Sequence, residues 1–391
     1  MSLEGEVYFV ETTSTTFAQL RLSPPMQAAL RSCGFERPTP IQAATLEPTL
    51  SGRDVLGAAQ TGTGKTAAFL IPIVERLRAE PGSALILAPT RELAEQIRGW
   101  TDRLGGGLHA ALVVGGVGFE PQVRALRQRP SIVVATPGRL VDHLQRRTAD
   151  LSRVGILVLD EADRMLDMGF KPQIDRILAA LPRQRQTMLF SATMPADLNA
   201  LARMHLREPV RVAVGPQALP PSRAEQEVYL VRQDGKTPLL LSLIERHDGN
   251  MLVFARTKHR TDRLHRVVHK AGHAVQRLHS NRSQSQRREA LEGFRRGRYR
   301  ILVATDIAAR GIDVSGIAHV INFDLPSTVE DYVHRVGRTA RAENSGQATS
   351  FAAPEEHGQL RAIERHLGRP LPRRSHERPA GVRPGPNVNM A

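Results

Sequence analysis

The chain has 391 residues, of which 41% are hydrophobic and 24% charged, so it can form a packed core and is long enough for two domains. Lysine and arginine total 54 against 39 acidic residues, a net charge of +15 that favours a polyanion, either nucleic acid or an anionic membrane surface. A single cysteine, Cys33, excludes internal disulfides and cysteine-based zinc sites. No stretch approaches about 18 consecutive apolar residues, so we expect a cytoplasmic protein without a membrane span.

Short apolar runs alternate with helix-like stretches from Asp54 onward. The first series is DVLGA, ALILAP, ALVVGG, SIVVATP, ILVLD and TMLFSAT, and the second is EVYLV, MLVFA, ILVATD, HVINF and ATSFAA. Apolar residues at consecutive positions are typical of strands buried on both faces of a parallel sheet. The sequence therefore predicts two α/β domains with doubly wound parallel sheets and with ligand sites at the carboxyl ends of the strands.

The boundaries between these parts follow from composition. Residues 214–223, VGPQALPPSR, are rich in proline and polar groups and predict a linker. The last stretch holds five arginines, one glutamate and five prolines, which predicts a mobile basic tail. We thus expect an N-terminal extension, a first domain, the linker, a second domain and the tail, at residues 1–16, 17–213, 214–223, 224–367 and 368–391.

The segment AAQTGTGKT, residues 58–66, follows an apolar run and precedes a helix-like run. In that setting glycines let backbone N–H groups close around phosphate oxygens at a helix N-terminus. Lys65 would reach the outer phosphates, and the Thr66 hydroxyl would help to hold Mg²⁺. The stricter pattern has glycine where Ala59 stands. We expect the whole loop to bind the nucleotide: Ala58, Ala59, Gln60, Thr61, Gly62, Thr63, Gly64, Lys65 and Thr66.

Two carboxylates come directly after a buried strand in LVLDEAD, residues 157–163. Asp160 is the expected Mg²⁺ partner, because a hard cation prefers oxygen ligands and phosphate-bound Mg²⁺ takes only one or two from protein. Glu161 can orient and deprotonate the attacking water. Taken alone, the tetrapeptide DEAD is equally compatible with an acidic turn or a helix cap.

Eight motifs together are more specific: GFERPTPIQ, AAQTGTGKT, PTRELA, TPGR, DEAD, SAT, ARGID and HRVGRTAR, in this order. Over residues 17–352 the chain resembles the DEAD-box RNA helicase family, with Ala340 and Asn281 where glycine and aspartate are common. The resemblance implies two RecA-like domains with the active site in the cleft between them. It also implies an ATP- and Mg²⁺-dependent ATPase that, on binding RNA, locally unwinds short duplexes or remodels RNA–protein complexes with little sequence preference.

The resemblance also assigns the remaining ATP-site residues. Phe35 would stack on adenine while Gln42 hydrogen-bonds its edge, with Phe17 and Pro40 in support. Gly311 and Asp313 would lie at the ribose, and Arg338 and Arg341 of the motif that begins at His334 would act as arginine fingers. Ser191 and Thr193 match the motif that links hydrolysis to strand separation. From the residues alone, HRVGRTAR could also be an arginine cluster on the surface, and Ser191 and Thr193 could also cap the next helix.

Other matching positions offer hydroxyls, glycine N–H groups and arginines, which suit contacts to sugar and phosphate rather than to bases. We expect RNA to be bound by Pro89, Thr90, Arg91, Gly115, Gly116, Thr136, Gly138, Arg139, Arg256, Thr257, Gln284, Arg287, Thr305, Arg310 and Gly311. Only 4% of the residues are aromatic, so the grip should be mainly electrostatic.

Three other interpretations stay open at this level. A translocating helicase of the wider superfamily would share the ATPase core, and a passive ATP-dependent RNA clamp would share the RNA site. A membrane-surface protein is suggested by charge alone, and no basic amphipathic helix supports it. The short core and basic tail resemble the bacterial RhlE-type subgroup. We expect a monomer that binds no membrane, with proteins of ribosome assembly or RNA decay as further partners.

Overall fold

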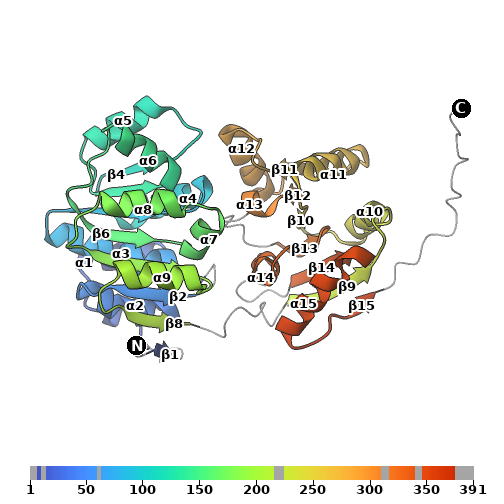
Figure 1. Ribbon diagram of the computed structural model, residues 1–391, viewed down its shortest axis with the longest axis horizontal. Coiled ribbons are helices and arrows are strands. Elements are labelled where there is room, and N and C mark those ends of the chain that lie inside the picture. The colour runs from blue at the N-terminus through green and yellow to red at the C-terminus, as the bar shows by residue number, and fades with distance from the viewer. Residues whose placement is uncertain are drawn as a thin grey trace, which may run out of the picture. The chain divides into compact units, whose positions relative to one another are not determined.

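The computed structural model describes residues 7–9, 15–59, 63–214, 224–309, 317–339 and 346–374, with the backbone alone at Val7–Phe9, Gln284, Ile307 and Glu330. The chain forms two compact units, one built mainly from the described residues up to 214 and the other mainly from those from 224 onward (Figure 1). Each is an α/β layer structure around a parallel sheet, so the predicted fold class is confirmed. No helix within the described ranges is long and apolar enough to cross a membrane.

The sheet of the first unit contains eight parallel strands within the described residues. Strands buried on both faces, such as Ile132–Ala135, are apolar at every position, because helices cover both sides of the sheet. In spatial order the strands are β1 (Val7–Phe9), β8 (Val210–Ala213), β2 (Val55–Ala58), β7 (Gln186–Ser191), β6 (Val154–Leu159), β3 (Ser83–Leu87), β5 (Ile132–Ala135) and β4 (Ala110–Val113).

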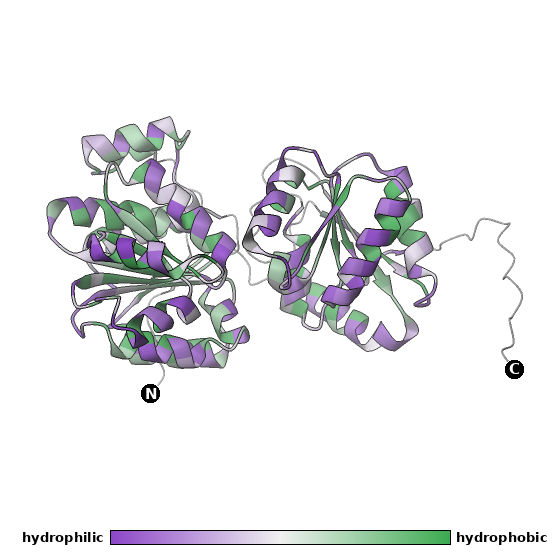
Figure 2. Cartoon of the chain, turned by 90° about the horizontal axis from the view of Figure 1, so that it is seen from above, coloured by the Kyte–Doolittle hydropathy of each residue, from purple (hydrophilic) through white to green (hydrophobic). Residues whose placement is uncertain are grey.

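Helices cover both faces of this sheet, and each layer encloses its own apolar cluster. Phe69 and Phe190 lie in the cluster beneath α1 to α4, whereas Met165 and Ile174 lie in the cluster beneath α6 to α9. Figure 2 shows the apolar sides of the helices turned toward the strands. The helices are η1 (Phe17–Gln19), α1 (Pro24–Ser32), α2 (Pro40–Leu50), α3 (Lys65–Ala79), α4 (Arg91–Leu104), α5 (Phe119–Arg127), α6 (Pro137–Gln145), α7 (Ala162–Asp167), α8 (Lys171–Ala179) and α9 (Ala196–His205).

The second unit repeats the plan with seven parallel strands in its described part. Their order is β11 (Val275–Leu278), β12 (Ile301–Ala304), β10 (Met251–Phe254), β13 (His319–Asn322), β14 (Gly346–Ala352), β9 (Ala224–Leu230) and β15 (Arg373–Arg374). The helices are α10 (Lys236–Arg246), α11 (Lys258–Lys270), α12 (Gln284–Arg295), α13 (Asp306–Ala309), α14 (Val329–Val336), η2 (Pro354–Glu356) and α15 (His357–Leu367).

Short strands at both ends of the chain correct the expected boundaries. Val7–Phe9, expected in a separate extension, form β1 and pair with β8. The tail expected from residue 368 is ordered through residue 374: Gly368 ends α15, the Leu371 side chain is buried, and Arg373–Arg374 pair with β9. Residues 375–391 lie outside the described part of the chain. The mobile-tail prediction is therefore wrong for residues 368–374, because Leu371 supplies an apolar anchor.

Parallel strands bring the predicted motifs to one edge of each sheet. In the first unit the phosphate loop follows β2, the two carboxylates follow β6, and SAT begins at the end of β7. These three strands are neighbours in the sheet, and the predicted RNA loops follow β3, β5 and β4 next to them. The strand order thus places the loops predicted to bind phosphate and those predicted to bind RNA side by side along the carboxyl edge.

Candidate active site

The phosphate loop is described at its two ends, Ala58–Ala59 and Thr63–Thr66, whereas Gln60, Thr61 and Gly62 lie outside the described residues. Gly64, at the start of α3, has φ +92°, in the left-handed region that favours glycine. A Cβ at Gly64 would collide with the amide of Gln42. Glycine is therefore required both by the backbone and by the close approach of α2.

Gln42 braces this loop from the first turn of α2, just after Pro40. The side chain is fully buried, its Oε1 accepts the backbone N–H of Thr39 at 2.9 Å, and its Nε2 donates to the carbonyl oxygen of Gly64 at 3.0 Å. A buried amide needs such partners. The carbonyl and the NH₂ group both have protein partners in this structure, so a hydrogen bond from Gln42 to adenine stays a prediction.

Three aromatic rings lie together near the start of the first unit. Phe17 is buried, with its ring centroid 6.1 Å from that of Phe35, and the Phe35 centroid lies 5.5 Å from that of Trp100 on α4. Phe35 is half-buried, so one part of its ring remains accessible. The sequence did not single out Trp100, because its contact with Phe35 spans about sixty residues of chain. Stacking of Phe35 on a base stays a prediction.

Asp160 and Glu161 follow β6 in a buried setting close to Lys65. Asp160 is 2% exposed, and burial raises its pKa to about 7, with the Glu161 charge adding to the rise and the Lys65 charge opposing it. The Lys65 ammonium donates to the carbonyl oxygen of Ala59 at 2.8 Å. A buried carboxylate next to further acidic groups fits a divalent cation, which would favour its charged form.

The ligand set offered by the chain is small. Thr66, in the first turn of α3, is half-buried, and its hydroxyl as an Mg²⁺ ligand stays a prediction. Among the described residues no group of three or more His, Cys, Asp or Glu side chains could hold a metal ion by itself. This donor set suits Mg²⁺ carried in with a phosphate, which takes few protein ligands, and does not suit a resident metal cage.

Glu161 has an unusual backbone conformation for a glutamate. Its φ is +51°, and it immediately precedes α7. Its carboxylate contacts the guanidinium of Arg164, and both side chains are buried. Left-handed residues other than glycine are uncommon and cluster at functional sites. The conformation turns the chain directly after the Mg²⁺ candidate Asp160.

Asp163 joins the acidic motif to the SAT motif, and the sequence prediction missed it. Its Oδ2 accepts the N–H of Ala192 at 3.2 Å and both the N–H and the hydroxyl of Thr193 at 2.9 Å. Burial alone would raise the pKa of Asp163, but the Lys65 charge and the hydrogen bond from Thr193 hold it below its usual value. This carboxylate is therefore a charged acceptor at the junction of two motifs.

The alternative role of Ser191 and Thr193 as caps of the next helix is wrong. Helix α9 begins after Pro195 and has no side-chain cap. The Thr193 hydroxyl donates to Asp163 instead, and the Ser191 hydroxyl donates to the carbonyl oxygen of Thr193 at 2.6 Å. The SAT segment is thus held against α7.

The loops after β3 and β4 meet at one arginine. Thr90, next to the buried Pro89, caps α4 by accepting the N–H of Leu93 at 3.3 Å. The guanidinium of Arg91 lies against Gly115 and Gly116: a Cβ at Gly115 would be 3.0 Å from Nη2, and one at Gly116 would collide with the guanidinium. Two predicted RNA loops thus form one surface, and its glycines leave room for Arg91.

The loop after β5 brings a second arginine to the same edge. Thr136 precedes α6, which begins Pro137–Gly138–Arg139. Nη1 of Arg139 donates to the carbonyl oxygen of Val117 at 3.0 Å, in the loop that follows Gly116, and its guanidinium lies 5.8 Å from the ring centroid of Phe119. Sequence reasoning did not identify Phe119, because one phenylalanine at a helix start carries no specific signal.

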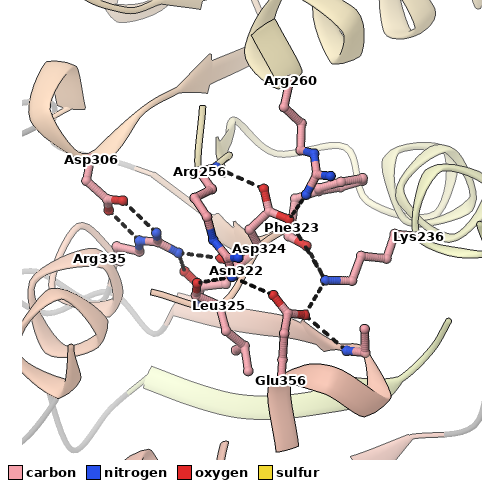
Figure 3. Close-up of polar contacts among 11 residues, drawn as sticks. Lys236, Arg256, Arg260, Asp306, Asn322, Phe323, Asp324, Leu325, Arg335 and Glu356 are labelled. Carbon is pink, nitrogen blue, oxygen red and sulfur yellow. Dashed lines mark hydrogen bonds and ion pairs between the residues drawn. The ribbon is translucent and has the colours of Figure 1, made fainter. Parts of the chain in front are cut away.

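In the second unit, Arg256 and Thr257 follow β10 and begin α11. The N–H of Arg256 donates to Oδ2 of Asp324 at 2.9 Å, and its Nη2 donates to Oε1 of Glu356 at 2.8 Å (Figure 3). Thr257 caps α11 by accepting the N–H of Arg260 at 3.2 Å. The Arg256 side chain is half exposed, so it can still contact a ligand.

Arg335, the first arginine of HRVGRTAR, is buried and fully engaged within its own unit. Its Nε and Nη2 bind the two oxygens of Asp306 at 2.6 and 2.7 Å, and its Nη1 donates to Asn322 Oδ1 at 3.0 Å and to the carbonyl oxygen of Asp324 at 2.7 Å (Figure 3). Thr305 immediately precedes Asp306. Arg335 thus ties the predicted RNA segment at Thr305 to the helix that precedes Arg338.

Lys236 completes this network, and nothing in the sequence pattern marked it. The side chain is 0% exposed, and its ammonium lies 2.6 Å from Glu356 Oε2, 3.0 Å from the carbonyl oxygen of Phe323 and 4.0 Å from Asp324 Oδ1. Asp324 also contacts the guanidinium of Arg260. Buried charges need such compensation, and here four segments of the unit supply it.

Two family models match the two halves of the chain. Residues 39–201 match that of the DEAD/DEAH box helicases, and residues 235–343 match that of the helicase conserved C-terminal domain. The chain belongs to the DEAD-box ATP-dependent RNA helicases. The helicase CshA of Bacillus subtilis (strain 168) is 44% identical over 363 residues, which cover 92% of this chain and 74% of CshA. CshA of Geobacillus kaustophilus (strain HTA426) is also 44% identical, over 364 residues, and covers 92% and 78%.

Solved DEAD-box structures agree with this fold. The structure of S. cerevisiae Dbp5 bound to RNA and ADP BeF3 has a TM-score of 0.83 and 29% identity, covering 92% of this chain and 95% of that one. Mss116p bound to ssRNA and AMP-PNP has a TM-score of 0.86 and 27% identity, covering 96% and 83%. The relatives named CshA do not support the finer assignment to the RhlE-type subgroup.

Some of the remaining predicted site residues of this helicase lie in the described part of the chain, and others lie outside it. His334 is half-buried on α14, Arg338 is buried just after that helix, and Arg287 is half-buried on α12. Gln284 begins α12, but its side chain is not described. Outside the described residues lie Arg310, Gly311, Asp313 and Arg341.

Proposed function

We propose that this helicase binds ATP with Mg²⁺ at the carboxyl ends of β2, β6 and β7 and hydrolyses it when RNA is bound. One observation carries the proposal: Lys65, Asp160 and Glu161 are buried together there, and Asp163 bonds directly to Thr193 of the next motif. The loops after β2 and β6 thus supply a phosphate ligand, a cation ligand and a candidate base, and β7 between these strands carries the SAT motif.

Each side chain has a distinct role in this proposal. Thr66 and Asp160 would hold Mg²⁺, which when bound supplies positive charge against the phosphates. Lys65 would exchange its bond with Ala59 for the outer phosphates. Glu161 would orient the attacking water and accept its proton. Arg338 and Arg341 would stabilise the charge that develops on the transferred phosphoryl group.

RNA would lie along the carboxyl edges of both sheets. In the first unit Arg91 and Arg139 border the loops after β3, β4 and β5, and in the second unit Arg256 and Thr257 border the start of α11. Such groups bind sugar and phosphate with little regard to base sequence. The RNA-bound structures of Dbp5 and Mss116p support this assignment.

The finer features of the activity follow from these contacts. Contacts to the RNA sugar–phosphate backbone do not depend on base sequence. They therefore suit an enzyme that opens short duplexes locally or remodels RNA–protein complexes of varied RNA sequence. The CshA proteins of Bacillus and Geobacillus support a bacterial helicase of this kind. We propose that it acts as a monomer in the cytoplasm, with proteins of ribosome assembly or RNA decay as partners.

A Glu161→Gln variant tests the proposed base, since it keeps the shape of the side chain and removes its basicity. The variant should bind ATP and RNA as the wild type does, while RNA-stimulated turnover falls by about 100-fold or more, the usual contribution of a general base. Glu80→Gln, at an exposed glutamate of the same unit, is the matched control and should keep full turnover. Wild-type turnover by the Glu161 variant would remove Glu161 from this role.

A further inference from the structure

Helix α11 has a regular division between its buried and exposed sides. Thr261, Leu264 and Val268 are buried against the sheet, and contacts join the helix to β11 and β12 (Figure 1). Because these positions recur every three or four residues, the opposite side faces solvent along the whole helix. The exposed residues on that side are His259, Arg263, Arg266, His269 and Lys270.

Three cations on this exposed side have no counter-charge. Among the described residues no ion pair is formed by Arg263, Arg266 or Lys270, which we call the α11 stripe. The Nε of Arg266 reaches only the carbonyl oxygen of Asp262, at 3.4 Å. Arg260, by contrast, is compensated by Asp324. The stripe therefore presents positive charge directly to solvent.

Asp262, the one acidic side chain of α11, is engaged by partners outside the helix. Asp262 Oδ1 lies 3.0 Å from Nη1 of Arg277 on β11 and 3.0 Å from Nε2 of the buried His279. The pKa of His265 falls to about 4, first because of burial and then because of the neighbouring Arg277, His269 and Arg282. The region around α11 thus carries an excess of positive potential, and no acidic residue of the helix offsets the stripe.

The stripe continues from a predicted RNA contact. Arg256 and Thr257 stand immediately before α11, and Arg263 follows less than two turns later. From Arg263 to Lys270 the helix rises about 10 Å, which is the length of roughly three stacked nucleotides at about 3.4 Å each. A strand that continues from the predicted contact at Thr257 along the exposed side of α11 would therefore meet three further cations.

The surface is chemically unlike a protein-binding face. Large exposed apolar side chains among the described residues are Val117, Met204 and Leu230, and none of them lies on α11. Protein interfaces need an apolar core, whereas phosphate backbones need dispersed cations. The observations thus favour a nucleic acid over an acidic protein.

We propose that the α11 stripe binds the phosphate backbone of RNA that flanks the segment held by the helicase motifs. This inference rests on the proposed RNA site and extends it to a second surface. The stripe would add affinity for long or structured RNA without contacting the reacting groups, so it would raise occupancy and leave the chemical step alone.

The test compares wild type with an Arg263→Ala/Arg266→Ala/Lys270→Ala variant of the full chain. Binding is measured by fluorescence anisotropy with a short RNA that fills only the motif loops and with the same RNA lengthened at both ends. We expect about tenfold weaker binding of the long RNA, and a log–log salt slope smaller by about 2, since each lost phosphate contact removes about 0.7. Binding of the short RNA and maximal ATP turnover should not change.

An Arg361→Ala/Arg365→Ala/Arg369→Ala variant is the matched control, because it removes three exposed arginines from α15 and the residues just after it. The control should retain long-RNA binding. The proposal is overturned if the stripe variant binds long RNA like wild type, if the control loses as much affinity, or if the stripe captures an acidic peptide while RNA binding is unaffected. Failure of wild type to bind even the short RNA would instead refute the proposed function.

Discussion

At the scale of single residues, one carboxylate connects nucleotide chemistry to the rest of the first unit. Asp163 accepts three hydrogen bonds from Ala192 and Thr193, so a displacement of the acidic motif would break bonds that hold the SAT loop. The carboxylate also lies near Lys65, the expected phosphate ligand. Asp163 can therefore report the state of the phosphate site to the segment that the family motif links to strand separation.

An Asp163→Asn variant should separate binding from coupling. The amide oxygen can replace only one of the two carboxylate oxygens, so its NH₂ group must face either the donors of Ala192 and Thr193 or the backbone N–H of Arg164, which should destabilise the first unit by about 1 to 3 kcal/mol. ATP binding should persist while RNA stimulation of turnover falls. Urea unfolding and ATPase assays with and without RNA measure the two effects. Asp175→Asn, at an exposed carboxylate on α8, should change neither.

His319 gives the second unit a defined response to acid. The side chain is 2% exposed, its Nε2 lies 2.8 Å from Thr349 Oγ1, and burial together with the His247 charge lowers its pKa to about 3. In the unfolded chain the pKa returns to its ordinary value near 6.5. Below that value the unfolded chain binds a proton that the folded chain does not, so stability falls as pH falls from 6.5 toward 3.

Substitution of His319 should therefore flatten the pH dependence of stability. Between pH 7 and pH 5 the wild-type protein should lose about 2 kcal/mol of unfolding free energy through this residue, at about 1.4 kcal/mol per pH unit below 6.5. His319→Gln lacks the titrating group and should not show this loss. Urea unfolding at both pH values, followed by circular dichroism, gives the comparison. Equal losses in the two proteins would show that His319 is not the titrating group.

At the scale of elements, a buried ionic network holds the carboxyl edge of the second sheet together. Lys236 on α10, Asp324 after β13 and Glu356 before α15 are drawn to the same point, where Arg256 also binds (Figure 3). Arg335 extends the network to α13 through Asp306. The network therefore holds the predicted RNA contacts at Arg256 and Thr305 in a fixed position relative to α14, the helix that precedes Arg338.

Substitution of Lys236, the central cation of the network, should lower the unfolding free energy of the second unit. Lys236→Met leaves Glu356 and Asp324 with less compensation and should lower the unfolding free energy by about 3 to 5 kcal/mol. Lys171→Met breaks an exposed pair with Asp175 and should cost less than about 1 kcal/mol. Denaturant unfolding of both variants tests the contrast. Similar small losses would mean that the network contributes little to stability.

The strands differ in how well the sequence reveals them. Runs such as Ile132–Ala135 and Met251–Phe254 are predictable, since central parallel strands are apolar at every position. Val275–Leu278 and Val210–Ala213 alternate with polar residues near the outside of their sheets, and Arg373–Arg374 carry no apolar residue at all. Such strands are fixed by pairing with distant segments, which local sequence does not encode.

The sequence likewise predicts some residues of the candidate site and misses others. Motif spacing identified the phosphate loop, Asp160 and Glu161, because a few residues in a row carry that chemistry. Asp163, Trp100 and the Lys236 network were missed, because their partners lie tens of residues away and only the folded sheet brings them together. Local motifs thus predict the ligands, and tertiary structure supplies the groups that hold them.

At the scale of the whole molecule, the proposed RNA-dependent hydrolysis requires ATP and RNA to favour the same state. If both ligands stabilise that state, each must tighten the binding of the other by the same factor, commonly about 5- to 150-fold. The first unit offers the phosphate loop, and the proposed charge stabilisation comes from Arg338 in the second unit. Coupling between ligands should therefore depend on that arginine.

An Arg338→Ala variant should lose this coupling. RNA affinity should no longer respond to a non-hydrolysable ATP analogue, and RNA-stimulated turnover should fall by about 10³-fold, the lower end of reported arginine-finger effects. The two reciprocal binding factors are measured by anisotropy with labelled RNA and labelled nucleotide. Arg361→Ala, on exposed α15, should leave both factors equal to those of wild type. Undiminished turnover by the Arg338 variant would contradict the arginine-finger role.

The two terminal strands, β1 and β15, limit the self-association of the protein. β1 covers the side of β8, and β15 covers the side of β9, so a few residues near each chain end shield backbone groups that could otherwise pair with a neighbouring molecule. Both strands fall outside residues 39–343, the span of the two family matches. A protein that lacked only β1 and β15 would keep its catalytic motifs and expose the edges of β8 and β9, so its solubility would suffer before its chemistry did.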